Sequence, residues 1–355
     1  MSLERGRTKR TGKAIRISLT AVFLGIFILL LVVYSLYSRI FVSNVSLEEG
    51  QVIFYIPTGS TYQEVVDRLE EEGIIISRRS FTWVAEKKEY DGQVRPGRYK
   101  IRDGMSNSTL VNMLRAGNQD PVMVVFNNIQ NLYELAGRVS GYLEEDSATF
   151  AAYLTAGETA ERCGFDRATF PSMFIPNTYE FYWTTTPEEF MERMKEEYEK
   201  FWKGERDRRA ENMGLSRVEV STLASIVDEE TIHDDENSRI AGVYLNRLER
   251  GIPLQADPTL KFALNDPSRK RILNTDKNID SPYNTYKNKG LPPGPISVPS
   301  ISAIDGVLNH EKHNYLFFCA KSDFSGYHAF ARTLSQHNQN AREYQRALNR
   351  NRIYR

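Results

Sequence analysis

The longest apolar stretch of the chain lies near its N-terminus, where 22 consecutive residues, 17–38, carry no charge. As a helix rising about 1.5 Å per residue, the stretch would extend roughly 33 Å, which is enough to cross a bilayer. We therefore expect a transmembrane helix over residues 17–38. Nothing else in the sequence approaches this length, so the pattern predicts a single-pass protein.

Short strand and helix patterns alternate after the apolar stretch. Residues 51–56 and 96–101 are typical of strands, while 80–88 and 105–117 are typical of helices. A further helix begins at a capping box of Ser60 and Gln63, and it has an apolar stripe at Tyr62, Val65, Val66 and Leu69 before Gly73 ends it. We predict a small α+β module over residues 46–120. It serves either as a packing or spacer unit or as a carbohydrate-binding module of the lysin-motif type.

Residues 121–355 form the larger predicted domain, and the expected fold class of the whole chain is α+β. The aromatic segment 174–186 could stack on sugar rings, but we expect it to belong to the core. Residues 191–211 have the pattern of one charged amphipathic helix with a solvated face, and residues 315–330 have that of a hairpin. The aromatic residues expected in the core are Phe174, Tyr179, Phe181 and Trp183.

The charges around the apolar stretch predict its orientation. Residues 1–39 hold seven basic residues and one acidic residue, whereas the rest of the chain has a net charge of −6. The positive-inside rule then makes residues 1–16 a cytoplasmic tail and places everything after Ile40 outside. A cleaved signal peptide is the competing interpretation, but its apolar region is normally shorter and ends in small residues, unlike Tyr34, Leu36 and Tyr37 here.

Composition and motifs exclude several classes of function. An acidic outer body argues against nucleic-acid binding, which needs a basic face. The chain lacks the HExxH, GxSxG, Walker A and GxGxxG motifs, and its five histidines have no recognised zinc spacing. Two cysteines, Cys163 and Cys319, are too few for a disulfide framework; we expect Cys319 to be buried, and a single bridge stays open. We predict neither a metal nor an organic cofactor.

One glutamate stands out on a helical wheel of residues 216–233. With Leu223 at zero and 100° per residue, Ile226 and Val227 lie on the apolar face with it, and Glu230 falls near 340°, within that face. Asp228 and Glu229 fall outside it. Burial would raise the pKa of Glu230, as a general acid at neutral pH requires. The alternative is a buried glutamate that is satisfied by a backbone or arginine partner.

Several polar, turn-rich pieces follow Glu230, and one of them, residues 290–299, is rich in proline and must form a shaped loop. Loops that carry amide, carboxyl, phenol and imidazole groups commonly bind sugar hydroxyls, although the same side chains also satisfy loop backbone. The other pieces are residues 254–259, 281–286 and 335–338.

The order of these segments resembles the YceG-like family of endolytic murein transglycosylases, the MltG type. The residues that carry the resemblance are LASIVDEET, RIAGVYLNRLERGIPLQADPTLKFAL, SPYNTYKNKGLPPGPISVPS and YHAFARTLSQHN. The family's catalytic glutamate is the last acidic residue before the threonine of its first motif, and that position is Glu230 here. Asp228 and Glu229 stand where the family often has Glu and Lys, which suggests that like charges raise the pKa of Glu230 further.

The resemblance implies a bacterial cytoplasmic-membrane protein that cuts nascent peptidoglycan strands between N-acetylmuramic acid and N-acetylglucosamine. It implies 1,6-anhydro ends, with one carboxyl acting first as acid and then as base, and a lysin-motif-like module next to the anchor. Its position beside wall synthesis suggests penicillin-binding polymerases as partners. The residues we expect to line the cleft and bind sugar are Gln255, Asp257, Asn284, Tyr286, His328 and His337.

Two other functions stay open on the residues alone. A muramidase-type hydrolase would use Asp257 as a second carboxylate beside Glu230 and would leave reducing ends. A non-catalytic wall-binding scaffold would keep Glu230 only as a structural group.

Overall fold

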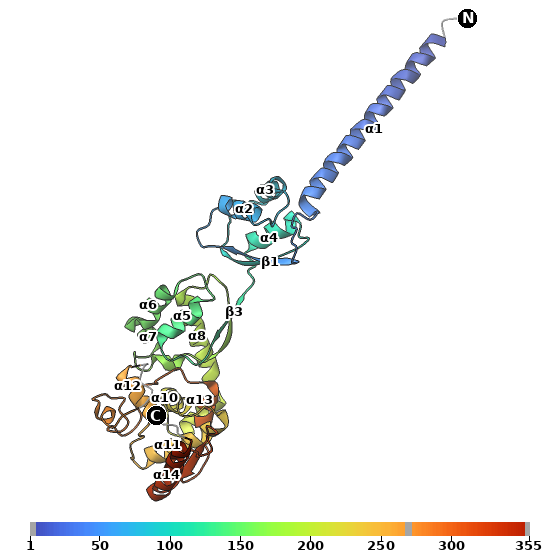
Figure 1. The fold of residues 1–355 in the computed structure, drawn as a ribbon. Helices are drawn as coiled ribbons and strands as arrows, with labels where there is room; N and C mark the ends of the chain where they lie inside the picture. The colour runs from blue at the N-terminus through green and yellow to red at the C-terminus, as the bar shows by residue number, and fades with distance from the viewer. Residues whose placement is uncertain (1–4, 267–271, 352–355) are drawn as a thin grey trace. The chain divides into compact units, whose positions relative to one another are not determined.

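The computed structural model describes the backbone of residues 5–266 and 272–351, and the side chains of residues 19–266 and 272–351 (Figure 1). The first four residues of the predicted cytoplasmic tail and the last four of the predicted larger domain lie outside this range. Helices and strands are mixed, as an α+β chain requires. Two compact units are present: Met1–Val122 with Tyr182–Thr184, and Met123–Phe181 with Thr185–Arg355.

The first unit begins with the long helix α1, Arg5–Phe41. Within α1, Leu19–Phe41 is the one helical segment of the described chain that is long and apolar enough to cross a membrane, and its side chains over residues 19–37 are exposed. This is compatible with a single-pass anchor. The helix extends beyond the predicted stretch of residues 17–38 because Arg39 and Ile40 continue it into contact with the rest of the first unit.

The rest of the first unit is a two-stranded sheet with three helices. Strand β1 pairs antiparallel with β2, with Phe54 opposite Tyr99, and both of these side chains are fully buried in the core. The predicted strands and helices of this region are all present. Their bounds are β1, Gln51–Ile56; α2, Tyr62–Glu71; α3, Arg78–Lys87; β2, Gly97–Arg102; and α4, Asn107–Ala116.

The start of α2 differs from the predicted one by a residue. Thr61, not Ser60, is the N-cap, and its side chain accepts a hydrogen bond from the Glu64 backbone N–H while the Glu64 carboxylate accepts from the Thr61 N–H. Both Ser60–Gln63 and Thr61–Glu64 fit the capping-box spacing, but glutamate is the charged acceptor at the positive end of the helix dipole. The predicted end is correct, since Gly73 has a φ of 67°.

The second unit opens with a two-stranded sheet, β3 and β4, and helices around an aromatic core. Phe174, Tyr179 and Phe181 are buried as predicted, whereas Trp183 is half-buried and belongs to the first unit, where its ring meets Tyr55. The elements are β3, Val122–Phe126; α5, Leu132–Ser140; α6, Ser147–Thr155; α7, Gly157–Cys163; η1, Phe170–Met173; and β4, Asn177–Phe181.

The predicted charged helix over residues 191–211 is two helices. α8, Pro187–Trp202, ends before Gly204, whose φ of 96° no other residue type adopts readily, and α9, Glu205–Asn212, begins after it. The charged face is solvated as expected. The inner face of α8 instead buries Phe190, Met194 and Trp202.

The remainder of the second unit surrounds a group of three packed helices, α10, Arg217–Asp228; α11, Asn237–Glu249; and α13, Ile301–Leu308. The predicted hairpin is present as β5, Phe317–Ala320, and β6, His328–Ala331, and α14, Leu334–Arg350, packs against it. The short elements are η2, Asp234–Glu236; α12, Asp257–Leu264; and η3, Asp276–Asn278.

Of the polar pieces that were predicted as turn-rich, the second half of residues 254–259 and all of residues 335–338 are helical instead. Asp257 is the first residue of α12, where a carboxylate is favoured by the helix dipole, and residues 335–338 form the first turn of α14. The proline-rich segment 290–299 is a loop without helix or strand, as predicted.

Candidate active site

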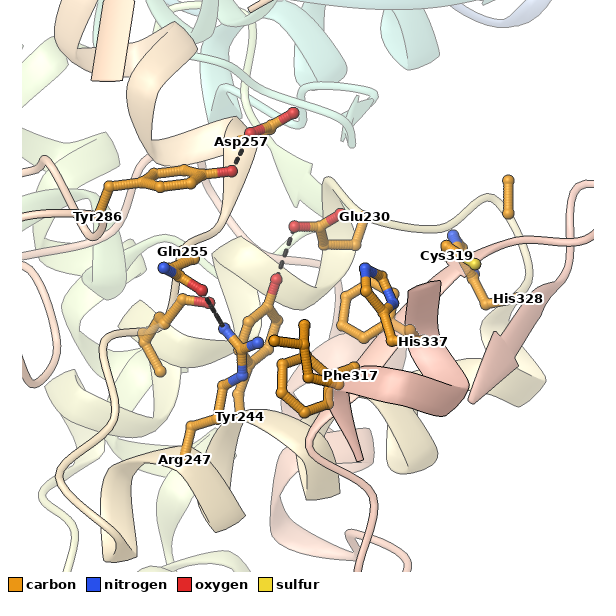
Figure 2. A pocket seen from close by; sticks show the side chains of 14 residues that line it. Glu230, Tyr244, Arg247, Gln255, Asp257, Tyr286, Phe317, Cys319, His328 and His337 are labelled. Atoms are coloured by element: carbon orange, nitrogen blue, oxygen red, sulfur yellow. Dashed lines mark hydrogen bonds between the residues drawn. The ribbon is translucent and has the colours of Figure 1, made fainter. Parts of the chain in front are cut away.

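A cleft of about 380 Å³ opens in the second unit between α11, α12, the β5–β6 hairpin and the start of α14 (Figure 2). It gathers five of the six predicted sugar-binding residues around Glu230. Its lining consists of Glu230, Tyr244, Arg247, Leu254, Gln255, Asp257, Tyr286, Phe317, Phe318, Cys319, Ala320, His328, Leu334 and His337.

Glu230 lies two residues beyond the end of α10, so the predicted helix is too long at this point. Its backbone N–H still donates to the Val227 carbonyl oxygen at 3.1 Å. This bond spans three residues, so the backbone makes one tighter, 3₁₀-like turn after α10. The side chain is partly buried, and its Oε1 accepts a hydrogen bond of 2.6 Å from the Tyr244 hydroxyl. The glutamate singled out by the wheel is therefore in the cleft, although not on the helix.

Burial raises the pKa of Glu230 from 4.5 to about 7. The Tyr244 hydrogen bond opposes this shift because it stabilises the carboxylate, and the charge of Asp257 adds to it. A carboxyl group with a pKa near 7 is half protonated at neutral pH, so it can both give and take a proton.

The neighbouring acids contribute less than the sequence suggested. Asp228 accepts hydrogen bonds from the Ser300 backbone N–H at 2.9 Å and the Ser300 hydroxyl at 2.6 Å, so it secures the start of α13. It is partly buried rather than turned to solvent, and this burial raises its own pKa. Glu229 is exposed and accepts a hydrogen bond from Gln130, and its charge raises the pKa of Glu230 least. The like-charge contribution comes first from Asp257.

A second carboxylate and tyrosine pair lies in the cleft. The Tyr286 hydroxyl donates to Asp257 Oδ1 at 2.6 Å. Asn284 is not in the lining: it is fully buried, its amide donates to the carbonyl oxygens of Lys277 and Ile279, and its own oxygen accepts from the Tyr286 N–H. Its geometry is that of a residue that shapes the loop and so positions Tyr286.

Arg247 and Gln255 meet at the floor of the cleft. The buried guanidinium donates to the carbonyl oxygens of Leu316 at 2.7 Å and Leu254 at 2.6 Å, and more weakly to Gln255 Oε1 at 3.4 Å. Gln255 has a φ of 55°, a strained value for a residue with a side chain, which turns the chain between α11 and α12. Arg247 thus ties α11 to the hairpin and to this turn.

Two histidines reach the cleft from the C-terminal elements. His328 Nδ1 lies 2.8 Å from Glu236 Oε2, and the buried Glu236 also accepts the His328 backbone N–H. The His337 ring stacks on Phe317 with 5.4 Å between centroids, and burial lowers its pKa, which favours the neutral form.

Sequence reasoning missed three residues of this site. Tyr244 and Arg247 are three positions apart on α11, and Glu236 precedes that helix. A helical wheel for α11 would have placed this tyrosine and arginine on the face that also carries Ile240, Ala241 and Leu248, which is the kind of signal that singled out Glu230.

Among the described residues, no group of three or more His, Cys, Asp or Glu side chains has an arrangement that could hold a metal ion. Cys163 and Cys319 are both free thiols, and Cys319 is half-buried in the cleft wall rather than fully buried as expected. Besides the Cys319 thiol, the lining offers carboxyl, phenol, amide and imidazole groups, which can transfer protons or form hydrogen bonds.

The sequence profile of the YceG-like family matches residues 54–343. The chain belongs to the YceG-like family. A YceG-like protein of known structure, from Listeria monocytogenes, is 25% identical, with a TM-score of 0.55 and coverage of 82% of this chain and 99% of that one.

Two curated relatives of this YceG-like chain carry the name endolytic murein transglycosylase. The Bacillus subtilis protein is 28% identical over 305 residues, 81% of this chain and 83% of its own length. The protein from Streptococcus pneumoniae serotype 2 is 28% identical over 320 residues, and the match spans only 57% of its length.

Proposed function

We propose that this protein is an endolytic peptidoglycan lytic transglycosylase, which cleaves the β-1,4 bond between N-acetylmuramic acid and N-acetylglucosamine in nascent strands and so terminates their elongation. One observation supports placing this activity in the cleft: the pKa of the Glu230 carboxyl is raised to about 7 there. The chain around it is YceG-like. The names of the relatives support the substrate class.

Glu230 performs both proton transfers in this proposal. As an acid it protonates the glycosidic oxygen while the bond to C1 of the muramic acid breaks. As a carboxylate it then takes the proton of the C6 hydroxyl, whose oxygen closes on C1 to form the 1,6-anhydro ring. No water is consumed, so no second carboxylate is needed to activate one.

The other cleft residues bind and orient the sugar. Their hydroxyl, amide, carboxylate and imidazole groups are spaced around Glu230, as polar groups of a sugar-binding cleft are. Asn284 acts indirectly by fixing the loop that carries Tyr286. The proposed sugar-binding residues are Gln255, Asp257, Tyr286, His328 and His337.

A hydrolase that used Asp257 as its second carboxylate is the alternative, and the products separate the two. The full-length protein in detergent would be incubated with uncrosslinked peptidoglycan strands, and the released muropeptides identified by mass spectrometry. Anhydro-muramic ends are expected. Reducing ends would instead make the protein a muramidase, and intact strands would leave the scaffold interpretation.

The pH dependence of cleavage is expected to follow Glu230. Because the acid form starts the reaction and its pKa is about 7 instead of 4.5, kcat/KM should be level below pH 7 and fall about tenfold per pH unit above it. Rates of strand cleavage between pH 5 and 9 would measure this. A kcat/KM that already falls about tenfold per pH unit from pH 5 upward would mean that Glu230 is solvated in the working enzyme.

The surrounding organisation completes the proposal. Residues 1–16 lie in the cytoplasm, residues 17–38 span the bacterial cytoplasmic membrane, and residues 121–355 are the catalytic domain outside it. Residues 46–120 form a lysin-motif-like module that binds glycan, which the order strand, helix, helix, strand over β1, α2, α3 and β2 supports. Penicillin-binding enzymes of wall synthesis are the proposed partners.

A further inference from the structure

The Tyr244 hydroxyl makes the hydrogen bond that fixes the side chain of Glu230. We propose that Tyr244 is a positioning residue: by occupying Oε1 of Glu230, it leaves Oε2 as the oxygen that carries the proton to and from the glycan. The inference rests on the proposed function of Glu230. It adds the identity of the reacting oxygen and of the residue that positions the carboxyl group.

Tyr244 is itself held rigidly. It lies in the middle of α11, its side chain is 2% exposed, and its ring packs edge-on against Phe318 at 5.7 Å between centroids. From this place the hydroxyl reaches Glu230 Oε1 at 2.6 Å, a short distance typical of a hydrogen bond to a charged acceptor (Figure 2). The hydrogen bond therefore ties the side chain of Glu230, which has several rotatable bonds, to a residue that is packed within α11.

Glu230 needs such a restraint because it follows α10 instead of belonging to it. Within the described part of the chain, the Tyr244 hydroxyl is the group that hydrogen-bonds to the Glu230 carboxyl. Glutamate has three side-chain torsions, and fixing one oxygen removes most of their freedom. A carboxyl that is already placed loses less entropy when it reaches the geometry for proton transfer.

The direction of the hydrogen bond decides where the proton resides. Burial and the nearby Glu230 raise the pKa of Tyr244 well above its usual range, so the phenol keeps its proton and remains the donor. When Glu230 is protonated, Oε1 is the carbonyl oxygen that accepts from Tyr244, and the O–H is on Oε2. Oε2–H then protonates the glycosidic oxygen as the C1–O bond breaks, and Oε2 recovers a proton when the C6 oxygen bonds to C1.

The same hydrogen bond affects the pH at which Glu230 changes from the acid to the carboxylate. It stabilises the carboxylate and offsets part of the burial effect, so its loss would raise the pKa of Glu230 further. The other titratable or charged groups around Glu230 are Glu229 beside it, Arg247 on α11, Asp257 and Lys261 on α12, Tyr286 from its loop, Cys319 on β5, His328 on β6 and His337 on α14.

The test is the pH profile of strand cleavage by the full-length Tyr244→Phe variant. We expect the fall in kcat/KM at high pH to move upward by about one pH unit, and the level below it to drop roughly tenfold or more. Tyr179→Phe is the matched control, because it also removes a buried hydroxyl, one that donates to the Ile175 carbonyl oxygen at 2.6 Å outside the cleft. Its pH profile should not move.

A second change keeps the test decisive if Tyr244→Phe folds poorly. Replacing Tyr244 by 3-fluorotyrosine retains the shape and makes the phenol more acidic, so the stronger donor should move the fall in kcat/KM to lower pH. An unmoved profile in both variants would overturn the inference. Glu230→Gln, assayed in parallel, separates the two proposals, since its full activity would overturn the role of Glu230 itself.

Discussion

Glu230→Gln is expected to abolish the release of anhydro-muropeptides, with a fall in rate of about a thousandfold or more. Glutamine has the shape of glutamate and keeps an oxygen that can accept from Tyr244, but its amide group has no acidic proton to transfer and is too weak a base to take one. The measurement is mass spectrometry of products over a time course with the full-length protein and uncrosslinked strands.

Glu229→Gln is the matched control for this loss. It makes the same chemical change one residue away, at an exposed carboxylate that contacts Gln130 and does not line the cleft. We expect it to keep most of the activity. Equal losses in both variants would point to a general effect of charge at the end of α10 instead of proton transfer by Glu230.

The stability of Glu230→Gln distinguishes a catalytic group from a structural one. In the wild type the folded pKa of about 7 exceeds the reference value of 4.5, so the folded state binds the proton more tightly. The contribution of Glu230 to stability is thus fully present below pH 4.5 and is lost as the pH rises through 7. A neutral glutamine avoids that loss, so the free energy of unfolding of the variant should exceed that of the wild type by up to about 3 kcal/mol at pH 8.

Glu230→Gln should therefore be at least as stable as the wild type in urea unfolding at pH 8, with the difference shrinking towards pH 5. A variant that is less stable than the wild type at both pH values and still cleaves strands would mean that Glu230 is a structural group and that another residue transfers the proton.

The sequence could predict Glu230 because its signal is local. An apolar stripe of period 3.6 ends in one carboxyl that continues the stripe, and the chain keeps nearly helical geometry for one turn beyond α10. The partner of that carboxyl could not be predicted in the same way. Tyr244 is 14 residues away on another helix, and only the packing of α10 and α11 brings the two groups together.

The polar loop residues show a second limit of prediction. Asn284 and Tyr286 are two residues apart in the same turn, yet one is buried under the loop backbone and the other lines the cleft. An asparagine can satisfy loop carbonyl and N–H groups or a ligand with the same atoms, so its type does not distinguish the two uses. Asp257 likewise looked like a loop residue because α12, which begins with it, is short.

The proline-rich loop 290–299 was predicted as a shaped segment, and the structure shows what it is shaped against. Gly294 is buried, and a Cβ at this position would overlap the backbone carbonyl of Ala168. Neither the backbone at Ala168 nor the loop at Gly294 can shift easily to relieve the overlap. Asp166 accepts hydrogen bonds from the Ala168 and Thr169 N–H groups, and Pro293 and Pro295 restrict the loop on either side of Gly294.

Gly294→Ala is therefore expected to destabilise the second unit by about 3 kcal/mol, which lowers its thermal midpoint by roughly 6–12 °C. Gly137→Ala is the control, because Gly137 is inside α5 with no atom near the added methyl group, and alanine there should be neutral or stabilising. The loop also contacts α10, the helix that precedes Glu230, since the Ile296 N–H donates to the Ser225 hydroxyl. We thus expect Gly294→Ala to lose activity at temperatures where it is still folded, whereas an unchanged midpoint would mean that the chain at Ala168 moves freely.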